Sequence, residues 1–348
     1  MPARLNEKSP PPFAGVMILA LVAIAGFAYV KWMPYYAKAF VAQSHHFIGD
    51  SILSGKAAAP PPASWGAATD YAIAYGKAIW QALVLGLILG SGIKVLLPAQ
   101  WVGAVLGRIG LRSIALAGLF ATPCMMCTCC AAPVAAGMRQ NRASVGSVVS
   151  WWISNPVLNP ATLVFMGFVL GWDWALFRVV LGIAMVLVVA RLAERYAGPH
   201  AAAFPEQYSI PEAVPQGNLM LRWVREFMTL AIRLVPEYLV LVLLLGAARV
   251  WLFPVLGAHD GIGWIVAMAL AGTLFVIPTA GEVPIVQAMF ALGMGAGPAG
   301  ALIMTLPAVS LPSLVMLRRV FSLRTRLVIA AGVALSGMAG GLVAMAVF

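Results

Sequence analysis

Apolar runs long enough to cross a bilayer recur along the whole of this chain, and Lys and Arg cluster at the ends of these runs. A helix spans a membrane with about 20 mostly apolar residues. Only 9% of the residues are charged, against about 25% in soluble proteins. The runs are continuous rather than short and alternating, which is typical of helices and not of a β-barrel. The sequence therefore predicts an all-α, multi-pass protein of a bacterial inner membrane, with the lipid bilayer as its surroundings.

The apolar runs and the polar stretches between them predict four regions. An N-terminal helix and an external loop occupy residues 1–70, a first repeat 71–196, a cytoplasmic linker 197–225 and a second repeat 226–348. The first run ends at Lys31 without a small-residue cleavage site, so we expect an uncleaved helix rather than a signal peptide. The membrane segments are predicted at 13–31, 71–97, 113–138, 145–171, 174–196, 227–253, 262–292, 297–317 and 326–347.

The positive charges predict which side of the membrane each loop occupies. Arginine pairs stand on both sides of the stretch 113–138, and cytoplasmic loops are enriched in Lys and Arg. That stretch then enters and leaves on one side, as a re-entrant hairpin broken at its prolines. The loops around 262–292 lack Lys and Arg, so this stretch is predicted as a hairpin from the outer side. Lys31 and Lys38 do not follow this enrichment, because they lie after the first helix in a region that is predicted to be external. The net charge of +11 fits this use of cations in loops and does not indicate nucleic acid.

A repeated pattern of prolines and glycines follows the two predicted hairpins. The pattern consists of Pro133, Gly146 and Pro156 in the first half, and Pro284, Gly297 and Pro307 in the second. In both halves the second and third positions stand 13 and 23 residues after the first (146 − 133 and 156 − 133; 297 − 284 and 307 − 284). Each half then has one crossing, one hairpin and two further crossings. An odd number of crossings predicts two inverted repeats with broken helices, which is a transporter architecture.

All four cysteines lie in one short run at the centre of the first hairpin: Cys124, Cys127, Cys129 and Cys130. On a helix, Cys124, Cys127 and Cys130 would line one side, whereas in an extended tip Cys127 and Cys129 would share a side. Soft thiolates favour Cu(I), Zn(II) or trivalent metalloids. We therefore predict that all four cysteines bind cargo and that Cys124, Cys127 and Cys130 form the set that binds a metal or metalloid. Their crowding argues against structural disulfides, which join distant segments.

Polar residues at other predicted breaks are further candidates for the cargo path. Glu282 lies in the second hairpin, and a carboxyl group at membrane depth costs roughly 2.5–3.5 kcal/mol unless it faces a cavity or partner. It is predicted to line the path or to couple transport to protons. Asn155 and Asn159 can face cargo or satisfy backbone groups freed by neighbouring prolines, and Thr279 is a weaker candidate of the same kind. A structural ion pair is expected between Arg233 and Glu237, four residues apart on one helix.

Several motifs resemble one family. They are the run from Pro123 to Pro133, then Gly146, then Ser154 to Pro160, and in the second half Ile277-Pro278, Glu282 to Ile285, Gly293 and Leu306 to Ala308. Over roughly residues 70–348 the chain resembles the predicted permeases of the ArsP type. The resemblance implies an efflux permease for trivalent organoarsenicals that uses cysteines of the first hairpin. This chain differs in having four crowded cysteines, and in having Thr279-Ala280-Gly281 where a thiol would be sought.

The sequence therefore predicts a secondary transporter that exports a thiophilic cargo, with no resident cofactor. A membrane thiol–disulfide oxidoreductase is the alternative, because the spacing Cys124-x-x-Cys127 is compatible with thiol exchange. The second half contains no cysteine, which counts against that alternative. A permease for a sulfur compound relayed by the cysteines is a third interpretation. No phosphate-binding glycine loop supports ATP hydrolysis on this chain.

Overall fold

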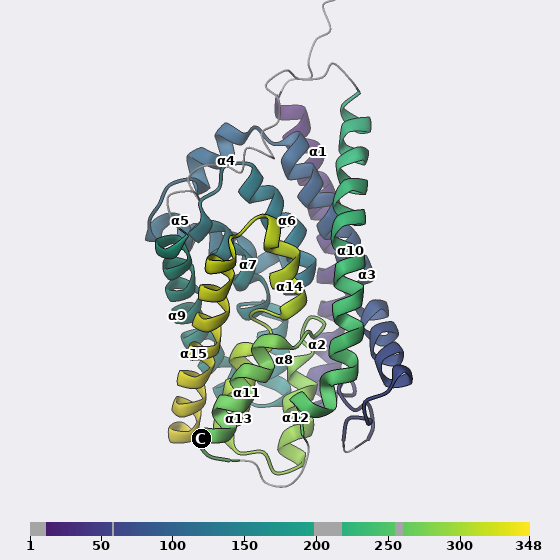
Figure 1. The fold of residues 1–348 in the computed structure, drawn as a ribbon, viewed down its shortest axis with the longest axis vertical. Coiled ribbons are helices and arrows are strands. Elements are labelled where there is room, and N and C mark those ends of the chain that lie inside the picture. The colour runs from purple at the N-terminus through teal and green to yellow at the C-terminus, as the bar shows by residue number, and fades with distance from the viewer. Residues whose placement is uncertain (1–11, 58, 198–217, 255–259) are drawn as a thin grey trace, which may run out of the picture.

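The computed structural model describes residues 12–57, 59–197, 218–254 and 260–348, and within these ranges the chain is built from helices (Figure 1). Five of the described helices are long and apolar enough to cross a membrane. They are Phe13–His45, which combines α1 (Pro12–Phe27), a π-helical turn (Ala28–Trp32) and α2 (Met33–His45), then α3 (Trp65–Leu96), α9 (Trp172–Tyr196), α10 (Leu219–Leu252) and α15 (Leu323–Val347). The predicted class, an all-α protein with several membrane-spanning helices, is confirmed.

The remaining helices are shorter than a span and occur as consecutive pairs separated by breaks. The pairs are α5 (Leu111–Ala121) with α6 (Thr128–Gln140), α7 (Val145–Val157) with α8 (Pro160–Val169), α11 (Ile262–Leu274) with α12 (Glu282–Ala291), and α13 (Ala296–Thr305) with α14 (Leu311–Met316). A short helix α4 (Ala99–Leu106) precedes α5 at a bend of 113°, and the two together make a sixth candidate span. A three-residue 3₁₀ turn, Leu317–Arg319, follows α14.

Prolines stand at all four breaks. Pro123, Pro278 and Pro307 lie in the gaps between paired helices, and Pro156 is the next-to-last residue of α7. Proline lacks the N–H that continues a helix and its ring clashes with the carbonyl four residues earlier. The segments predicted as single crossings at 145–171 and 297–317 are therefore each interrupted near the middle.

The N-terminal helix is longer than predicted. It continues to His45, whereas the sequence reading ended the span at residue 31 and treated 32–70 as a loop. Pro34 explains the π-helical turn that precedes it, because proline cannot donate to the carbonyl of residue 30 and the turn widens around it. The residues after this turn stay apolar and helix-forming, so the helix resumes instead of ending. Most of the predicted linker 197–225 lies outside the described residues.

Long helices flank the broken ones (Figure 1). α3 lies beside α10 and runs in the opposite direction, and α9 lies beside α15 in the same antiparallel way. The broken helices lie between these pairs, where α6 packs on α3 and α7, and α13 packs on α11 and α15. Every residue of α7 is buried. The broken helices therefore lie inside the core, and the long helices each contribute one buried face to it.

Each half has the same order of elements: one long helix, two broken pairs and a second long helix, with α4 as an addition to the first half. Gly146 and Gly297 are the second residues of α7 and α13, and Pro133 and Pro284 lie inside α6 and α12. The inverted relation between the halves stays a prediction.

Two ion pairs join α10 to other elements. Lys94 of α3 pairs with Glu226 of α10, with Nζ and Oε1 2.5 Å apart. Glu237 pairs with Arg318 from the turn after α14, so the expected pair between Arg233 and Glu237 is wrong. The i,i+4 spacing shows which side chains can meet on one helix, but a residue from another element lies closer to this carboxylate.

A glycine contact between α3 and α6 gives the first prediction. A Cβ at Gly90 would lie 2.3 Å from the carbonyl oxygen of Pro133, and a backbone atom cannot move aside as a side chain can. Gly90→Ala is expected to destabilise the protein by about 1–3 kcal/mol, the usual cost of overpacking. Thermal unfolding of the purified protein in detergent measures this change.

Gly76→Ala is the matched control on the same helix, because a Cβ there meets nothing within 4 Å. It should be neutral, or stabilising by up to about 1 kcal/mol through helix propensity. If the two substitutions change the stability equally, α3 and α6 are not in close contact at Gly90.

Candidate functional site

All four helix breaks contribute to one small cavity inside the protein. Its wall includes Cys127 and Thr128 from the first break, Pro156 from the second, Thr279 and Glu282 from the third and Pro307 from the fourth. The volume open to the centre of a water molecule is about 10 Å³, which is room for about one water. Three of the predicted site residues, Cys127, Thr279 and Glu282, thus come together although they are far apart in sequence.

Two thiols form a close pair at this cavity. Cys127 is the residue before α6 and Cys130 lies in its first turn, with their Sγ atoms 3.0 Å apart and neither in a disulfide. Met125 has a left-handed backbone with φ of 51°, which turns the chain just before the pair. The backbone N–H of Met126 donates to Asn155 Oδ1 at 3.3 Å. The tip of the first broken pair is therefore held in place by α7.

The other two cysteines lie apart from this pair. Cys124 is half-buried in a 3₁₀ turn, with Sγ 3.7 Å from the carbonyl oxygen of Phe120. Cys129 is buried with Sγ 3.6 Å from Ser310 Oγ at the start of α14. Among the residues that the structure describes, no three His, Cys, Asp or Glu side chains are grouped to hold one ion. The predicted set of Cys124, Cys127 and Cys130 is not assembled here, because the chain leaves the helix between Cys124 and Thr128.

A buried lysine from the N-terminal helix reaches the same cavity wall. Lys31 Nζ donates to Thr279 Oγ1 at 3.1 Å and to the Tyr35 hydroxyl at 3.3 Å, and the side chain is only 4% exposed. Its ammonium interacts electrostatically with Cys127 and Cys130. The sequence reading did not include Lys31 among the site residues. The available signal was its position, because a lysine at the outer end of an apolar run violates the positive-inside pattern.

Glu282 is neutralised by a second residue that sequence reasoning missed. Its Oε1 lies 2.6 Å from Arg178 Nη1, and both side chains are buried. Arg178 also donates from Nε to the carbonyl of Val157 (2.9 Å) and from Nη2 to that of Pro156 (2.6 Å). Arg178 therefore ties the second break to the third. The available signal was an arginine inside a predicted span.

One oxygen of this ion pair remains free for other contacts. Glu282 Oε2 is buried and has no hydrogen-bond partner among the described residues, and the residue lines the cavity. A buried carboxylate oxygen without a partner is costly. It is thus a place where a bound molecule could donate a hydrogen bond.

The two asparagines hold the backbone at the breaks. Asn155 donates from Nδ2 to the carbonyl of Trp151 at 3.0 Å, in addition to accepting from Met126. Asn159 Oδ1 accepts from the N–H groups of Ala161 and Thr162 and caps α8. These contacts match the structural alternative given for both residues. Asn159 Nδ2 has no partner within the described residues.

The cap at α8 gives the second prediction. Asn159→Ala removes the acceptor for two backbone N–H groups and is expected to cost about 0.5–2 kcal/mol of stability. Asn159→Ser keeps a capping oxygen and should recover most of that loss, as Ser310 serves at α14. Thermal unfolding in detergent compares the two variants. Equal losses would mean that the amide, rather than the cap, is what the site requires.

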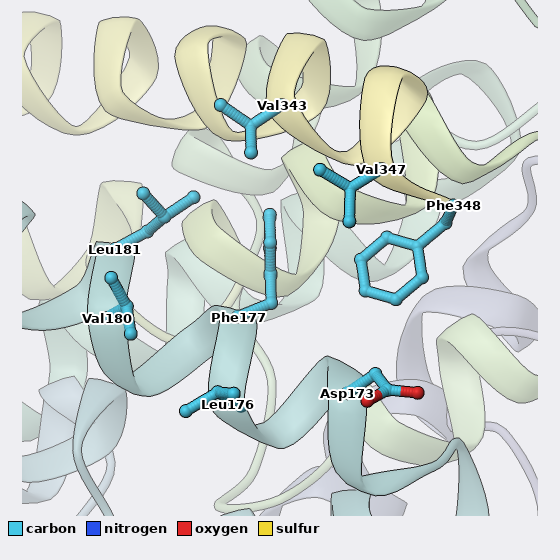
Figure 2. A pocket seen from close by; sticks show the side chains of 8 residues that line it. All are labelled: Asp173, Leu176, Phe177, Val180, Leu181, Val343, Val347 and Phe348. Carbon is cyan, nitrogen blue, oxygen red and sulfur yellow. The ribbon is translucent and has the colours of Figure 1, made fainter.

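A larger cavity lies elsewhere, between α9 and α15 (Figure 2). Its volume is about 390 Å³, and Asp173 is the one charged side chain among the eight that line it. Leu176 and Val347 there are 63% and 69% exposed. None of the predicted site residues lines this cavity. Its lining is mostly apolar, unlike the wall of the small cavity, which includes a thiol, two hydroxyl groups and a carboxyl group.

Comparison with known proteins assigns the chain to a family. A family profile described as "Predicted permease", ArsP_1, matches residues 64–346. The chain belongs to this permease family. The permease is 55% identical over 327 residues to UPF0718 protein YraQ of Escherichia coli (strain K12), covering 92% of both chains. It is 22% identical over 306 residues to UPF0718 protein MJ0584 of Methanocaldococcus jannaschii, covering 69% of this chain and 84% of that one. No solved structure matches it.

Membership makes the protein a membrane transporter and confirms the family predicted from the sequence. The family match begins at residue 64, after α1 and α2. The cavity, its thiol pair and the Arg178–Glu282 ion pair therefore lie in the part of the permease that the family shares. Lys31 lies outside that part.

Proposed function

We propose that the permease exports a thiophilic cargo, such as a trivalent organoarsenical or a related metalloid or metal, across the bacterial inner membrane. One observation carries this proposal. The Cys127 and Cys130 thiols lie 3.0 Å apart, and Cys127 lines the cavity where all four helix breaks meet. Broken helices that meet at the membrane midplane are where secondary transporters bind substrate.

Two thiols suit a cargo that must bind and leave. A methylated arsenic(III) dihydroxide, CH₃As(OH)₂, exchanges its two As–O bonds for two As–S bonds, and the two hydroxyl groups leave with the two thiol protons as water. The product carries no net charge, and soluble thiols reverse the reaction. A closed set of four sulfur ligands would instead be typical of a structural zinc site.

The arrangement of the helices supports alternating access between two inverted repeats. α3 and α10 run in opposite directions, as do α9 and α15 (Figure 1). The ends of α5 and α6 away from their break lie in the upper part of the view, and those of α11 and α12 lie in the lower part (Figure 1). The cavity lies at the breaks, between the two sets. Rocking of one half against the other would open it to each side in turn.

Proton coupling, if transport uses it, is assigned to Glu282. Protonation of this carboxyl group removes the charge that Arg178 pairs with, and Arg178 holds two carbonyls at the second break. A proton at Glu282 would therefore loosen the contact between the second and third breaks.

Survival and cargo retention in a metalloid-sensitive bacterial strain test the proposal. Cells expressing the permease are compared with cells expressing a variant in which all four cysteines are serine. The cargo panel is methylarsenite, arsenite, antimonite, copper and zinc, and immunoblots match the amounts of protein in the membrane. We expect one or more cargoes to be tolerated better and retained less, and the variant to lose this effect. No response to any cargo, with the protein in the membrane, would refute thiol-dependent efflux.

A membrane thiol–disulfide oxidoreductase is the second candidate function, favoured by the spacing Cys127-x-x-Cys130 and by the 3.0 Å contact at the start of α6. Oxidation of this pair to a disulfide would pass two electrons and two protons to an external oxidant. Trapping thiols in intact cells measures the reduced fraction of the pair. If the reduced fraction of the pair stays the same when an oxidant or a reductant is added to the medium, the oxidoreductase function is ruled out.

A further inference from the structure

Lys31, on a helix that precedes the family match, contacts the cavity wall through Thr279. The π-helical turn at Ala28–Trp32 contains it, and such turns occur frequently at functional sites. The next residue, Trp32, donates from Nε1 to the carbonyl of Pro123 at 2.7 Å, at the break that carries the thiols. Lys31 itself bonds to Thr279 at the third break. The N-terminal helix therefore contacts the first and third breaks with two adjacent side chains.

The ammonium of Lys31 has no carboxylate counter-ion in the part of the chain that the structure describes. A charged group inside a membrane is expensive and is normally paired. In the described part of the chain, its hydrogen bonds go to two neutral oxygens, those of Tyr35 and Thr279, and no carboxylate forms an ion pair with it. The nearby carboxylate at Glu282 is already paired with Arg178. While both thiols carry their protons, one net positive charge thus remains beside the pair.

We propose that Lys31 and Thr279 form an anion subsite next to Cys127 and Cys130. The cargo is then a thiophilic anion, with a soft sulfur or metalloid atom for the thiols and a negatively charged oxygen for the ammonium and the hydroxyl. This inference rests on the proposed function and narrows its cargo class. Bare metal cations are disfavoured at such a site, because they would meet an ammonium that has no carboxylate partner.

A rival explanation is that Lys31 acts only on the thiols, as a positive charge that keeps one of them reactive. The two explanations differ in what they do to reagents of different charge. A subsite favours negative reagents over neutral ones. A charge that only activates the thiol speeds the reaction with every reagent by the same factor.

Three thiol reagents of different charge separate these explanations. In a variant with Cys124→Ser and Cys129→Ser, only Cys127 and Cys130 remain. Membrane vesicles are treated with neutral methyl methanethiosulfonate, with its negatively charged ethylsulfonate analogue and with its positively charged ethyltrimethylammonium analogue. Each reagent transfers its thioalkyl group to a thiolate and releases methanesulfinate. The rate with the neutral reagent normalises the other two.

We expect the negative reagent to react at least about tenfold faster than the positive one, because a single charge at short range inside a protein exceeds this difference. Lys31→Met should remove the preference and Lys31→Arg should keep it. Lys38→Met is the matched control, a lysine seven residues further along the same helix and partly exposed, and it should leave the preference unchanged. Thiosulfate should slow labelling by the neutral reagent in the parent and not in Lys31→Met, whereas chloride should slow neither.

Each alternative outcome identifies what has failed. If the neutral reagent labels neither thiol from either side of the membrane, the cavity is not a cargo site and both proposals fall. If it labels them but the charge preference is the same in Lys31→Met, only the anion subsite is wrong. Equal slowing of all three reagents in Lys31→Met would assign Lys31 to thiol reactivity alone and overturn the subsite. Absence of thiosulfate protection in the parent overturns it without relying on a substitution at Lys31.

Discussion

Cys127→Ser and Cys130→Ser are each expected to reduce export to the level of cells that lack the permease, whereas Cys124→Ser should keep most of it. The two thiols that lie 3.0 Å apart are the pair available to one cargo atom, and losing either leaves a single bond. We expect at least about a tenfold loss of export rate, which corresponds to 1.4 kcal/mol. Cargo retained by loaded cells over time gives the rate.

Cys124→Ser is the control in this series, because Cys124 lies half-buried on the turn before the tip and contacts the carbonyl of Phe120. Cys129→Ser tests the remaining thiol, which lies next to Ser310. Protein in the membrane is quantified for every variant. Equal losses of export rate in Cys124→Ser and Cys127→Ser would contradict the two-thiol site. They would mean that the cysteines are grouped differently in the conformation that binds cargo.

Arg178→Met is expected to destabilise the permease by about 3–5 kcal/mol, the usual cost of removing one partner from a buried ion pair. The substitution leaves the Glu282 carboxylate buried without its counter-ion, and removes the donors to the carbonyls of Pro156 and Val157. Thermal unfolding in detergent measures the loss of stability.

Two further variants interpret this result. Arg178→Met combined with Glu282→Met replaces the pair by apolar side chains, and should recover much of the stability without restoring transport. Arg318→Met breaks the exposed pair with Glu237 and should cost no more than about 1 kcal/mol. Restored transport in the double variant would show that the ion pair serves stability alone.

The sequence predicts those features that depend on local chemistry. Proline disfavours the interior of a helix, so the break at Pro123 could be placed without coordinates. The same rule predicts a break at Pro133, and that prediction is wrong, because Pro133 lies inside α6. Glu282 and Thr279 could be predicted as site residues because a polar group at membrane depth, next to a helix break, normally faces a cavity or a partner. The family could be named because its motifs consist of these same break residues.

The features that sequence reasoning missed depend on contacts between distant segments. The partner of Glu282 is Arg178, which is over 100 residues away in the chain, and no periodicity links them. The grouping of the cysteines depends on the left-handed backbone conformation of Met125. This conformation ends the helical spacing that would have placed Cys124 beside Cys127. Arg233 and Glu237 met the rule for a helical pair, but Glu237 found its partner on another element.

Lys31 and Trp32 are neighbours in the chain, but they bond to opposite halves of the molecule, Trp32 to Pro123 and Lys31 to Thr279. Two adjacent side chains on one helix cannot follow two bodies that move apart, so the proposed rocking of the halves would break one of these bonds. A hydrogen bond contributes about 0.5–1.5 kcal/mol, or about 1.5–3 kcal/mol when one partner is charged. In that cycle, this free energy would be part of the activation barrier of each turnover. In the proposed transport cycle the N-terminal helix would therefore act as a latch, and the strength of its two contacts would set how long this conformation lasts.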